Sequence, residues 1–333
     1  MINSAGISGV RTLARQPYIA GFCILLSLCL PFILKNNAYL LVVMCLSGIC
    51  IVATAGLDLL FGYSGQISLG HAAFYSVGAY TSAILSTRLG VDVWLCIMLG
   101  GIFAAVFAAL VAGPICKLVH MFLALATIGI GELTYQVIIN LPALTGSFQG
   151  VKKIPFPHIG RYVFDRFSYF YAILGFVIIA LIVKQRIVGS RVGRAFIAIR
   201  ENADAANAMG INVTYYKVLA FAVSAFFTGI AGALYAHYIG FISPESFTLD
   251  QSVLFLTIVL FGGMGTFLGP IIGSLVLISV NEGFQALGAY QMLVYGIVII
   301  VGVIFMPEGL AGGIRKIRAN LSKKVVNAFA TKP

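Results

Sequence analysis

The sequence predicts an all-α polytopic membrane protein with about ten transmembrane helices, some of them broken or re-entrant. Hydrophobic residues make up 60% of the 333 positions and charged residues 9%, so the chain lacks the polar surface that a soluble domain of this size needs. Several uncharged runs are about 17 to 31 residues long, and roughly 20 helical residues span the core of a bilayer. The strands of a transmembrane β-barrel would alternate between polar and apolar residues, whereas these runs are continuous.

The first half of the chain contains five predicted spans. Residues 1–17 carry Arg11 and Arg15 without an acidic residue, which indicates a cytoplasmic N-terminal segment. The run 18–34 is predicted to be a retained helix and not a signal peptide, because no small-residue cleavage site follows it. The next four spans are predicted from the apolar runs 38–57, 68–87, 93–113 and 118–141.

The second half contains five more spans, which complete a transmembrane domain over residues 18–312. A loop over residues 142–166 and a charged loop over residues 187–216 interrupt the apolar pattern. The uncharged run 251–281 is too long for one span, and the glycines within it predict a break between two helices. The remaining spans are predicted from the runs 167–183, 218–240 and 283–306, and a basic tail covers residues 313–333.

Ten spans place both termini on one side of the membrane, and the positive charges indicate that this side is the cytoplasm. The loop 187–216, with Lys184, Arg186 and Lys217 at its edges, then also falls inside. The loop 142–166 falls outside although it carries basic residues, since long loops follow the charge rule poorly. The net charge of +11 is therefore interpreted as membrane topology and not as a sign of nucleic-acid binding.

The sequence shows no constellation for catalysis or metal binding. The six cysteines lie in or beside apolar runs without a Cys-x-x-Cys pair, and the four histidines are scattered. Gly-x-Ser-x-Gly and the phosphate-binding Gly-x-x-x-x-Gly-Lys-Ser/Thr are both missing from the sequence. We therefore predict no catalytic residue, no metal site and no cofactor bound by this chain. Any ATP that drives it must be hydrolysed by another chain.

The segment 190–212 holds three arginines, a glutamate and an aspartate in a chain with few charges. Its residues from Arg194 to Met209 favour one helix, and Gly210 is predicted to end that helix as the C′ residue. Arg200 and Asp204 are four residues apart, so they can pair on one face. The spacing alone fits both a plain surface helix and a short helix that lies in a groove of another protein.

A second polar segment, residues 56–74, contains four glycines that predict a break in the helical pattern. Its polar side chains are Asp58, Tyr63, Ser64, Gln66, Ser68 and His71. Backbone that leaves the helix at membrane depth can offer N–H and C=O groups to a transported solute, and the alternative is an ordinary cytoplasmic turn. The pattern Phe61-Gly62-x-x-Gly65 is echoed by Phe261-Gly262-x-x-Gly265, as expected for duplicated halves.

Glu132 lies within an apolar run, with Thr127 nearby and Gln136 one turn later on the same face. A carboxylate inside a membrane is costly, so Glu132 is predicted to line a pathway, to anchor a structural hydrogen bond or to lie at the external interface. The same alternatives apply to His237 and Glu282, and the sequence names no partner for either.

Segments spread over about residues 38–312 resemble the permeases of branched-chain amino acid importers of the LivM type. Asp204-Ala-Ala-x-x-x-Gly210 is similar to the signature of ABC importer permeases, with aspartate in place of glutamate and without the Leu-Pro that follows it there. The other matching segments are Asp58-Leu-Leu-Phe-Gly-Tyr-Ser-Gly-Gln-Ile-Ser-Leu-Gly-His-Ala-Ala-Phe, Gly78-Ala-Tyr-Thr, Leu123-Ala-Leu-Ala-Thr, Gly131-Glu132, Leu144-Thr-Gly, Ser190-Arg-Val-Gly-Arg-Ala, Ala198-Ile-Arg-Glu, Gly210-Ile-Asn, Ala231-Gly-Ala-Leu, Phe261-Gly-Gly-Met-Gly-Thr, Gly269-Pro270 and Pro307-Glu-Gly-Leu.

The resemblance implies an ABC importer permease architecture in the bacterial inner membrane. The implied partners are the lipid bilayer, a homologous second permease, two ATP-binding subunits and a periplasmic substrate-binding protein. The implied cargo is a branched-chain or other hydrophobic amino acid, with urea or amides as alternatives in the same family. A secondary transporter or channel without an ATPase is a further alternative, disfavoured because only Glu132 and Glu282 suit ion coupling.

The resemblance implies a group of ATPase-coupling residues, and the glycine break and the carboxylate of Glu132 predict a group that lines the translocation pathway. The ATPase-coupling group is Arg191, Gly193, Arg194, Arg200, Glu201, Asp204, Ala205 and Gly210. The translocation-pathway group is Tyr63, Ser64, Gln66, Ser68, His71, Thr127, Glu132 and Gln136.

Overall fold

The computed structural model describes residues 38–284 except for 117, 119, 160 and 161, together with positions 290, 293, 296, 297, 300, 309, 310 and 312. Four sequence predictions concern segments that lie outside these residues, wholly or in large part. These segments are the N-terminal segment 1–17, the span 18–34, the span 283–306 and the basic tail 313–333.

The first half of the described chain is helical. Helix α3 (Ala38–Asp58) continues into a single π-helical turn, η1 (Leu59–Tyr63), and residues 64–70 then leave helical geometry. Three further long helices follow, α4 (His71–Arg88), α5 (Val93–Ile115) and α6 (His120–Asn140). The predicted break between the second and third spans is therefore confirmed, and the third span begins at His71, three residues later than predicted.

Short elements follow α6. They are α7 (Pro142–Thr145), the 3-10 turn η2 (Ser147–Gln149) and the strands β1 (Val151–Lys152), β2 (His158–Ile159) and β3 (Tyr162–Val163). Strand β1 pairs antiparallel with β4 (Phe241–Ile242), and β2 pairs antiparallel with β3. The predicted loop 142–166 is thus fastened by backbone hydrogen bonds to a segment far along the chain.

The second half begins with α8 (Arg166–Gly189), which extends beyond the predicted end at residue 183. The charged loop forms α9 (Arg191–Glu201) and α10 (Ala203–Ala208), and the long helix α11 (Val213–Ile239) follows. After β4, the 3-10 turn η3 (Pro244–Phe247) leads into α12 (Leu249–Gly262) and α13 (Gly269–Gly283). Residues 263–268 separate α12 from α13, which confirms the predicted break in the long uncharged run.

Within the described residues, six helical segments are long and apolar enough to cross a membrane. They are Tyr39–Tyr63, Val93–Ile115, Phe122–Asn140, Arg166–Gly189, Val213–Ile239 and Pro244–Gly262. With α4 and the shorter apolar α13, the long helices correspond to the eight predicted spans between residues 38 and 281. The chain is therefore a helical protein of polytopic type, and the total of ten spans stays a prediction.

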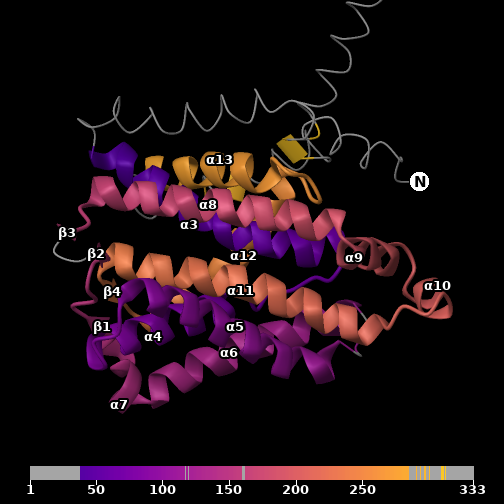
Figure 1. Ribbon diagram of the computed structural model, residues 1–333, viewed down its shortest axis with the longest axis horizontal. Coiled ribbons are helices and arrows are strands. Elements are labelled where there is room, and N and C mark those ends of the chain that lie inside the picture. The colour runs from indigo at the N-terminus through magenta and orange to yellow at the C-terminus, as the bar shows by residue number, and fades with distance from the viewer. Residues whose placement is uncertain are drawn as a thin grey trace, which may run out of the picture.

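The helices lie side by side, and the two connecting segments of interest lie at opposite ends of them (Figure 1). Helix α11 is central and packs against α3, α4 and α5, while α8 and α13 pack on α3. The short strands and α7 gather at one end, and α9 and α10 lie at the other end (Figure 1). This placement agrees with the predicted topology, in which the loops 142–166 and 187–216 fall on opposite sides of a membrane.

Helices α4, α5 and α11 approach each other closely because glycines line their contacts. A Cβ atom added at Gly78 would lie 2.1 Å from the carbonyl oxygen of Gly229, and one added at Gly232 would lie 2.0 Å from that of Tyr75. Small residues at such contacts let helix backbones approach closely, which favours van der Waals packing between helices in a membrane. These glycines fix the position of α11 relative to α4.

We expect Gly78→Ala to destabilise the protein by about 1–3 kcal/mol, because the new methyl group must push α4 away from α11. The matched control is Gly175→Ala in α8, where an added Cβ would meet no atom within 4 Å. The thermal unfolding midpoint in detergent measures both variants. Equal midpoints for the two variants would contradict the proposed packing.

Candidate functional site

The break between η1 and α4 buries all six polar side chains of the segment 56–74. Each is at most 9% exposed, and they are Asp58, Tyr63, Ser64, Gln66, Ser68 and His71. The π-helical turn at its start adds a residue to the helix, and such turns often occur at functional sites. The sequence predicted that these residues lie together, and the structure shows what each one contacts.

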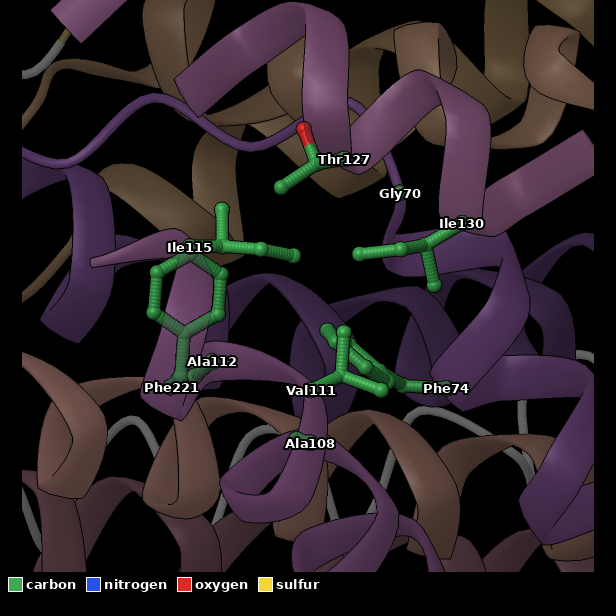
Figure 2. Close-up of a pocket in the computed structure, with 9 residues that line it drawn as sticks. All are labelled: Gly70, Phe74, Ala108, Val111, Ala112, Ile115, Thr127, Ile130 and Phe221. Carbon is green, nitrogen blue, oxygen red and sulfur yellow. The ribbon is translucent and has the colours of Figure 1, made fainter. Parts of the chain in front are cut away.

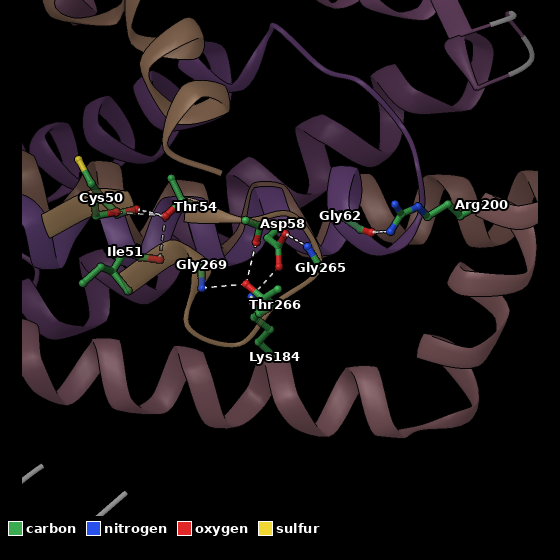
Figure 3. A network of polar contacts seen from close by, with 12 residues as sticks. Cys50, Ile51, Thr54, Asp58, Gly62, Lys184, Arg200, Gly265, Thr266 and Gly269 are labelled. Atoms are coloured by element: carbon green, nitrogen blue, oxygen red, sulfur yellow. Dashed lines mark hydrogen bonds and ion pairs between the residues drawn. The ribbon is translucent and has the colours of Figure 1, made fainter. Parts of the chain in front are cut away.

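Asp58 forms a buried ion pair with Lys184 of α8 (Figure 3). The Nζ atom of Lys184 lies 2.7 Å from Oδ2 of Asp58 and donates a hydrogen bond of 3.0 Å to the carbonyl oxygen of Thr266. The backbone N–H of Gly265 donates to the other carboxylate oxygen of Asp58 at 2.7 Å. Helices α3 and α8 and the link between α12 and α13 therefore meet at one carboxylate.

Lys184 was expected at the edge of the cytoplasmic loop, and the structure adds a buried partner that the sequence did not indicate. Its side chain is 1% exposed and lies within α8, where it neutralises the completely buried Asp58. A buried ion pair is stable only when further hydrogen bonds satisfy both charges, as Gly265 and Thr266 do here. The ammonium group also lies 6.0 Å from the centre of the Tyr63 ring.

The two segments that share the Phe-Gly-x-x-Gly pattern face each other. A Cβ atom at Gly62 would lie 2.6 Å from the backbone nitrogen of Gly265, so only glycine allows this approach. Gly265 itself has a φ of +66°, a conformation that favours glycine. The sequence echo therefore marks two breaks in the helical structure that are in direct contact.

His71 and its neighbours are satisfied by protein atoms. The Nδ1 atom of His71 lies 3.0 Å from the Ser68 hydroxyl, and Nε2 lies 2.8 Å from the Ser224 hydroxyl of α11. Gln66 donates to the Ser64 hydroxyl at 2.5 Å. The predicted choice was between a solute-lining break and a cytoplasmic turn, and in this conformation the segment is a buried cross-link between helices.

Thr127 of α6 joins this segment from the side. Its hydroxyl accepts a hydrogen bond of 3.0 Å from the backbone N–H of Leu69, so α6 is fastened to the break. Beside it lies a small apolar pocket between α4, α5, α6 and α11 (Figure 2). The residues that line this pocket are Gly70, Phe74, Ala108, Val111, Ala112, Ile115, Thr127, Ile130 and Phe221.

Glu132 and Gln136 lie on the outer face of α6 and are exposed. Gln136 donates a hydrogen bond of 3.1 Å to Glu132, which confirms that the two side chains share a face. The structure does not bring them together with the buried residues of the break. A carboxylate on the surface of a long apolar helix needs a partner or water, because contact with lipid is costly.

The charged loop forms two helices and not the single helix predicted from Arg194 to Met209. Asn202 adopts an extended conformation, and its side chain caps α10 by accepting a hydrogen bond from the Ala205 N–H. Asparagine competes with helical hydrogen bonding in this way, which the alanine-rich composition concealed. Gly210 has a φ of +84°, and the adjacent backbone bonds form a Schellman motif, so the predicted helix end is confirmed.

Helix α9 packs one face onto the protein. Its buried residues are Gly193, Ala195, Phe196 and Ile199. A Cβ at Gly193 would lie 2.3 Å from the carbonyl oxygen of Val188, so this glycine permits the sharp turn out of α8. The possible pairing of Arg200 with Asp204 loses its helical geometry because Asn202 interrupts the helix between them, and Nη1 of Arg200 donates to the carbonyl oxygen of Gly62.

The remaining residues of the predicted coupling group are exposed. They are Arg191, Arg194, Glu201, Asp204, Ala205 and Gly210. Met209 was not singled out from the sequence, yet its side chain is 84% exposed at the end of α10. The sequence feature that could have identified Met209 is a long apolar side chain directly before the glycine that ends the helix.

His237 has partners that the sequence could not name. Its Nε2 lies 2.8 Å from the Ser82 hydroxyl of α4, and its Nδ1 lies 2.8 Å from the carbonyl oxygen of Pro155. The imidazole thus fastens the loop 142–166 to the helices and acts as a structural cross-link. Glu282 is half-buried near the end of α13.

We expect Asp58→Asn and Lys184→Met each to lower the free energy of unfolding by about 3–5 kcal/mol, because each leaves one buried charge without its partner. The double variant leaves neither charge, so its loss of unfolding free energy should be smaller than the sum of the losses in the two single variants. Thermal unfolding in detergent measures all three, with the exposed Arg186→Met in the same helix as control. Additive losses would show that the pair does not interact.

Comparison with known proteins shows which family the chain is similar to. The chain matches the family described as "Branched-chain amino acid transport system / permease component" over residues 39–303. It is 33% identical over 304 residues to the high-affinity branched-chain amino acid transport system permease protein LivM of Salmonella typhimurium, which covers 84% of this chain and 71% of that protein.

Two further relatives cover most of the chain. LivM of Escherichia coli is 33% identical over 289 residues, covering 80% of this chain and 68% of the relative. The permease protein LivH of Escherichia coli is 26% identical over 285 residues, covering 77% of this chain and 89% of the relative. No solved structure matches the chain.

Proposed function

This chain belongs to the family of permease components of branched-chain amino acid transport systems, and from that premise we propose how it works in an ATP-driven importer. It forms one half of a translocation pathway for branched-chain or other hydrophobic amino acids. A homologous second permease supplies the other half, two ATP-binding subunits supply the energy, and a periplasmic binding protein delivers the cargo. Both termini and the loop 187–216 face the cytoplasm.

The observation that carries this proposal is the exposed tip formed by α10. This tip lies at one end of the helices, far from the strands at the other end (Figure 1). Met209 at the end of α10 is 84% exposed, and Asp204 and Ala205 of the same helix are also exposed. A flexible methionine on a small, alanine-rich helix is suited to fill an apolar groove of a partner protein.

Helix α9 connects this tip to the membrane helices. It packs on η1, α8 and α11, and the ring of its buried Phe196 lies against Tyr216 of α11. Because the protein interior is close-packed, a displacement of α10 is passed to these helices. The two helices of the charged loop therefore have different proposed roles. Helix α10 contacts the ATPase, and helix α9 transmits the movement to the membrane helices.

The exposed outer face of α6 is the proposed contact surface for the second permease. Among the candidate spans, α6 is the one least covered by the rest of the described chain. It carries Glu132 and Gln136 on its exposed face, and a second subunit with a polar pathway would remove this carboxylate from lipid. The similarity to both LivM and LivH supports pairing with a homologous chain.

The experiment is purification of the tagged chain from native membranes in mild detergent, followed by mass spectrometry of the proteins that remain bound. We expect two ATP-binding subunits and a second permease with the wild type. Asp204→Lys should reduce the recovered ATPase about tenfold or more, because it reverses an exposed charge at the proposed contact.

The matched control is Glu245→Lys, an exposed charge reversal in η3 at the opposite end of the helices. It should recover as much ATPase as the wild type. A wild-type chain that is recovered alone and still transports amino acids without ATP would instead be a secondary carrier. ATPase recovery that is equal in Asp204→Lys and Glu245→Lys would remove α10 from the contact.

A further inference from the structure

Arg200 connects helix α9 to the first glycine break. Its Nη1 donates a hydrogen bond to the carbonyl oxygen of Gly62 in the π-helical turn (Figure 3). The stem of Arg200 lies against Gly65, where an added Cβ would be 3.0 Å from Cγ of the arginine. Gly65 has a φ of +73°, so glycine at this position both permits the turn and admits the arginine.

The first break is in turn fastened to the second. Gly62 is in contact with Gly265, and Asp58 accepts the hydrogen bond from the backbone of Gly265. Lys184 joins the same point by contacting both Asp58 and the carbonyl oxygen of Thr266. A continuous series of contacts therefore runs from Arg200 through the first break to the link between α12 and α13 (Figure 3).

These contacts share one property, which is that charged side chains hold backbone groups. Arg200 holds a carbonyl, Asp58 an N–H group and Lys184 a second carbonyl. Such contacts fix the position of the backbone and do not depend on the identity of the side chains there. They are suited to transmit a displacement, because hydrogen bonds to charged groups are directional and stronger than those between neutral groups.

The exposure of Arg200 argues against a role in stability alone. Arg200 is exposed and its hydrogen bond to Gly62 is partly buried, whereas Asp58 and Lys184 are fully buried. Breaking this single, partly buried contact is therefore expected to leave the fold in place while it releases one element from the other. The side chain of Arg200 extends from α9 to the carbonyl oxygen of Gly62, so this contact connects α9 to the π-helical turn.

We propose that Arg200 is a positioning residue that delivers the movement of α9 to the two glycine breaks. The inference rests on the proposed function, in which an ATPase moves α10 and α9. Each displacement of α9 then pulls on the carbonyl of Gly62, and the Asp58 contacts carry it to the link between α12 and α13. Both breaks change position together, and ATP hydrolysis becomes coupled to solute movement.

The test uses the complete transporter, with both permeases and both ATP-binding subunits, in proteoliposomes supplied with the binding protein. The readout is the amount of branched-chain amino acid taken up per ATP hydrolysed. Arg200→Ala should retain the bound ATPase and its hydrolysis, while uptake per ATP falls about tenfold or more, since loss of one charge-assisted hydrogen bond changes an equilibrium by that order.

Arg200→Lys keeps the charge and part of the stem but loses the forked guanidinium, so it should give an intermediate ratio. If Arg200→Ala is not recovered from the membrane, the uptake per ATP of Arg200→Lys tests the same coupling role. Arg186→Ala removes an exposed arginine from the adjacent helix α8 and serves as the control, with the wild-type ratio expected.

Two results would overturn the inference. Unchanged uptake per ATP in both Arg200 variants would show that the contact transmits nothing. Loss of the bound ATPase from the Arg200 variants would place Arg200 in the docking contact and not behind it. Failure of the wild-type chain to recover any ATPase would be a different outcome, because it would refute the proposed function itself.

Discussion

The buried carboxylate of Asp58 is the point on which the arrangement of the helices depends. It lies at the end of α3, directly before the π-helical turn, and pairs with an ammonium group from α8. It also holds a backbone N–H from the link between α12 and α13. Because a buried charge without a partner is costly, the three parts of the chain must stay together to keep the Asp58 carboxylate paired.

The glycine breaks explain how the backbones come close enough for these contacts. Gly62 and Gly265 touch without side chains between them, and the N–H and C=O groups released by the breaks are held by charged residues. Irregular backbone at membrane depth is tolerated only where protein or water satisfies it. The breaks are therefore fixed by a few strong contacts, and one of these contacts leads to the charged loop at the end of the helices.

Local sequence signals predicted the features that depend on local chemistry. The apolar runs gave eight of the helices, the glycines marked both breaks, and Gly210 ended its helix as expected. Contacts between distant residues could not be predicted in this way. The Asp58–Lys184 pair joins two apolar runs with no pattern that links them, so the sequence placed Lys184 at the edge of the charged loop without naming its partner. Asn202 was overlooked because its capping effect competes with a strong alanine signal.

The predicted pathway residues divide into a buried group and an exposed group, and this division fits a subunit that is only part of a pathway. The residues near the break bond to each other in this conformation, whereas Glu132 and Gln136 face outward from α6. A pathway that uses both groups requires a second subunit and a change in the breaks. Both requirements agree with the proposal that an ATPase moves this permease through its charged loop.

Site-directed cross-linking from Met209 is the most direct test of this account. Met209→Cys would place a thiol on the exposed tip of α10, and the four of the six native cysteines that the structure describes, Cys45, Cys50, Cys96 and Cys116, are buried, so a variant with the native cysteines replaced is the background. In native membranes, a short bifunctional thiol-to-amine reagent should join this cysteine to an ATP-binding subunit. Glu245→Cys at the opposite end should give no such product. A cross-link to the ATPase from residue 245 and none from residue 209 would contradict the account.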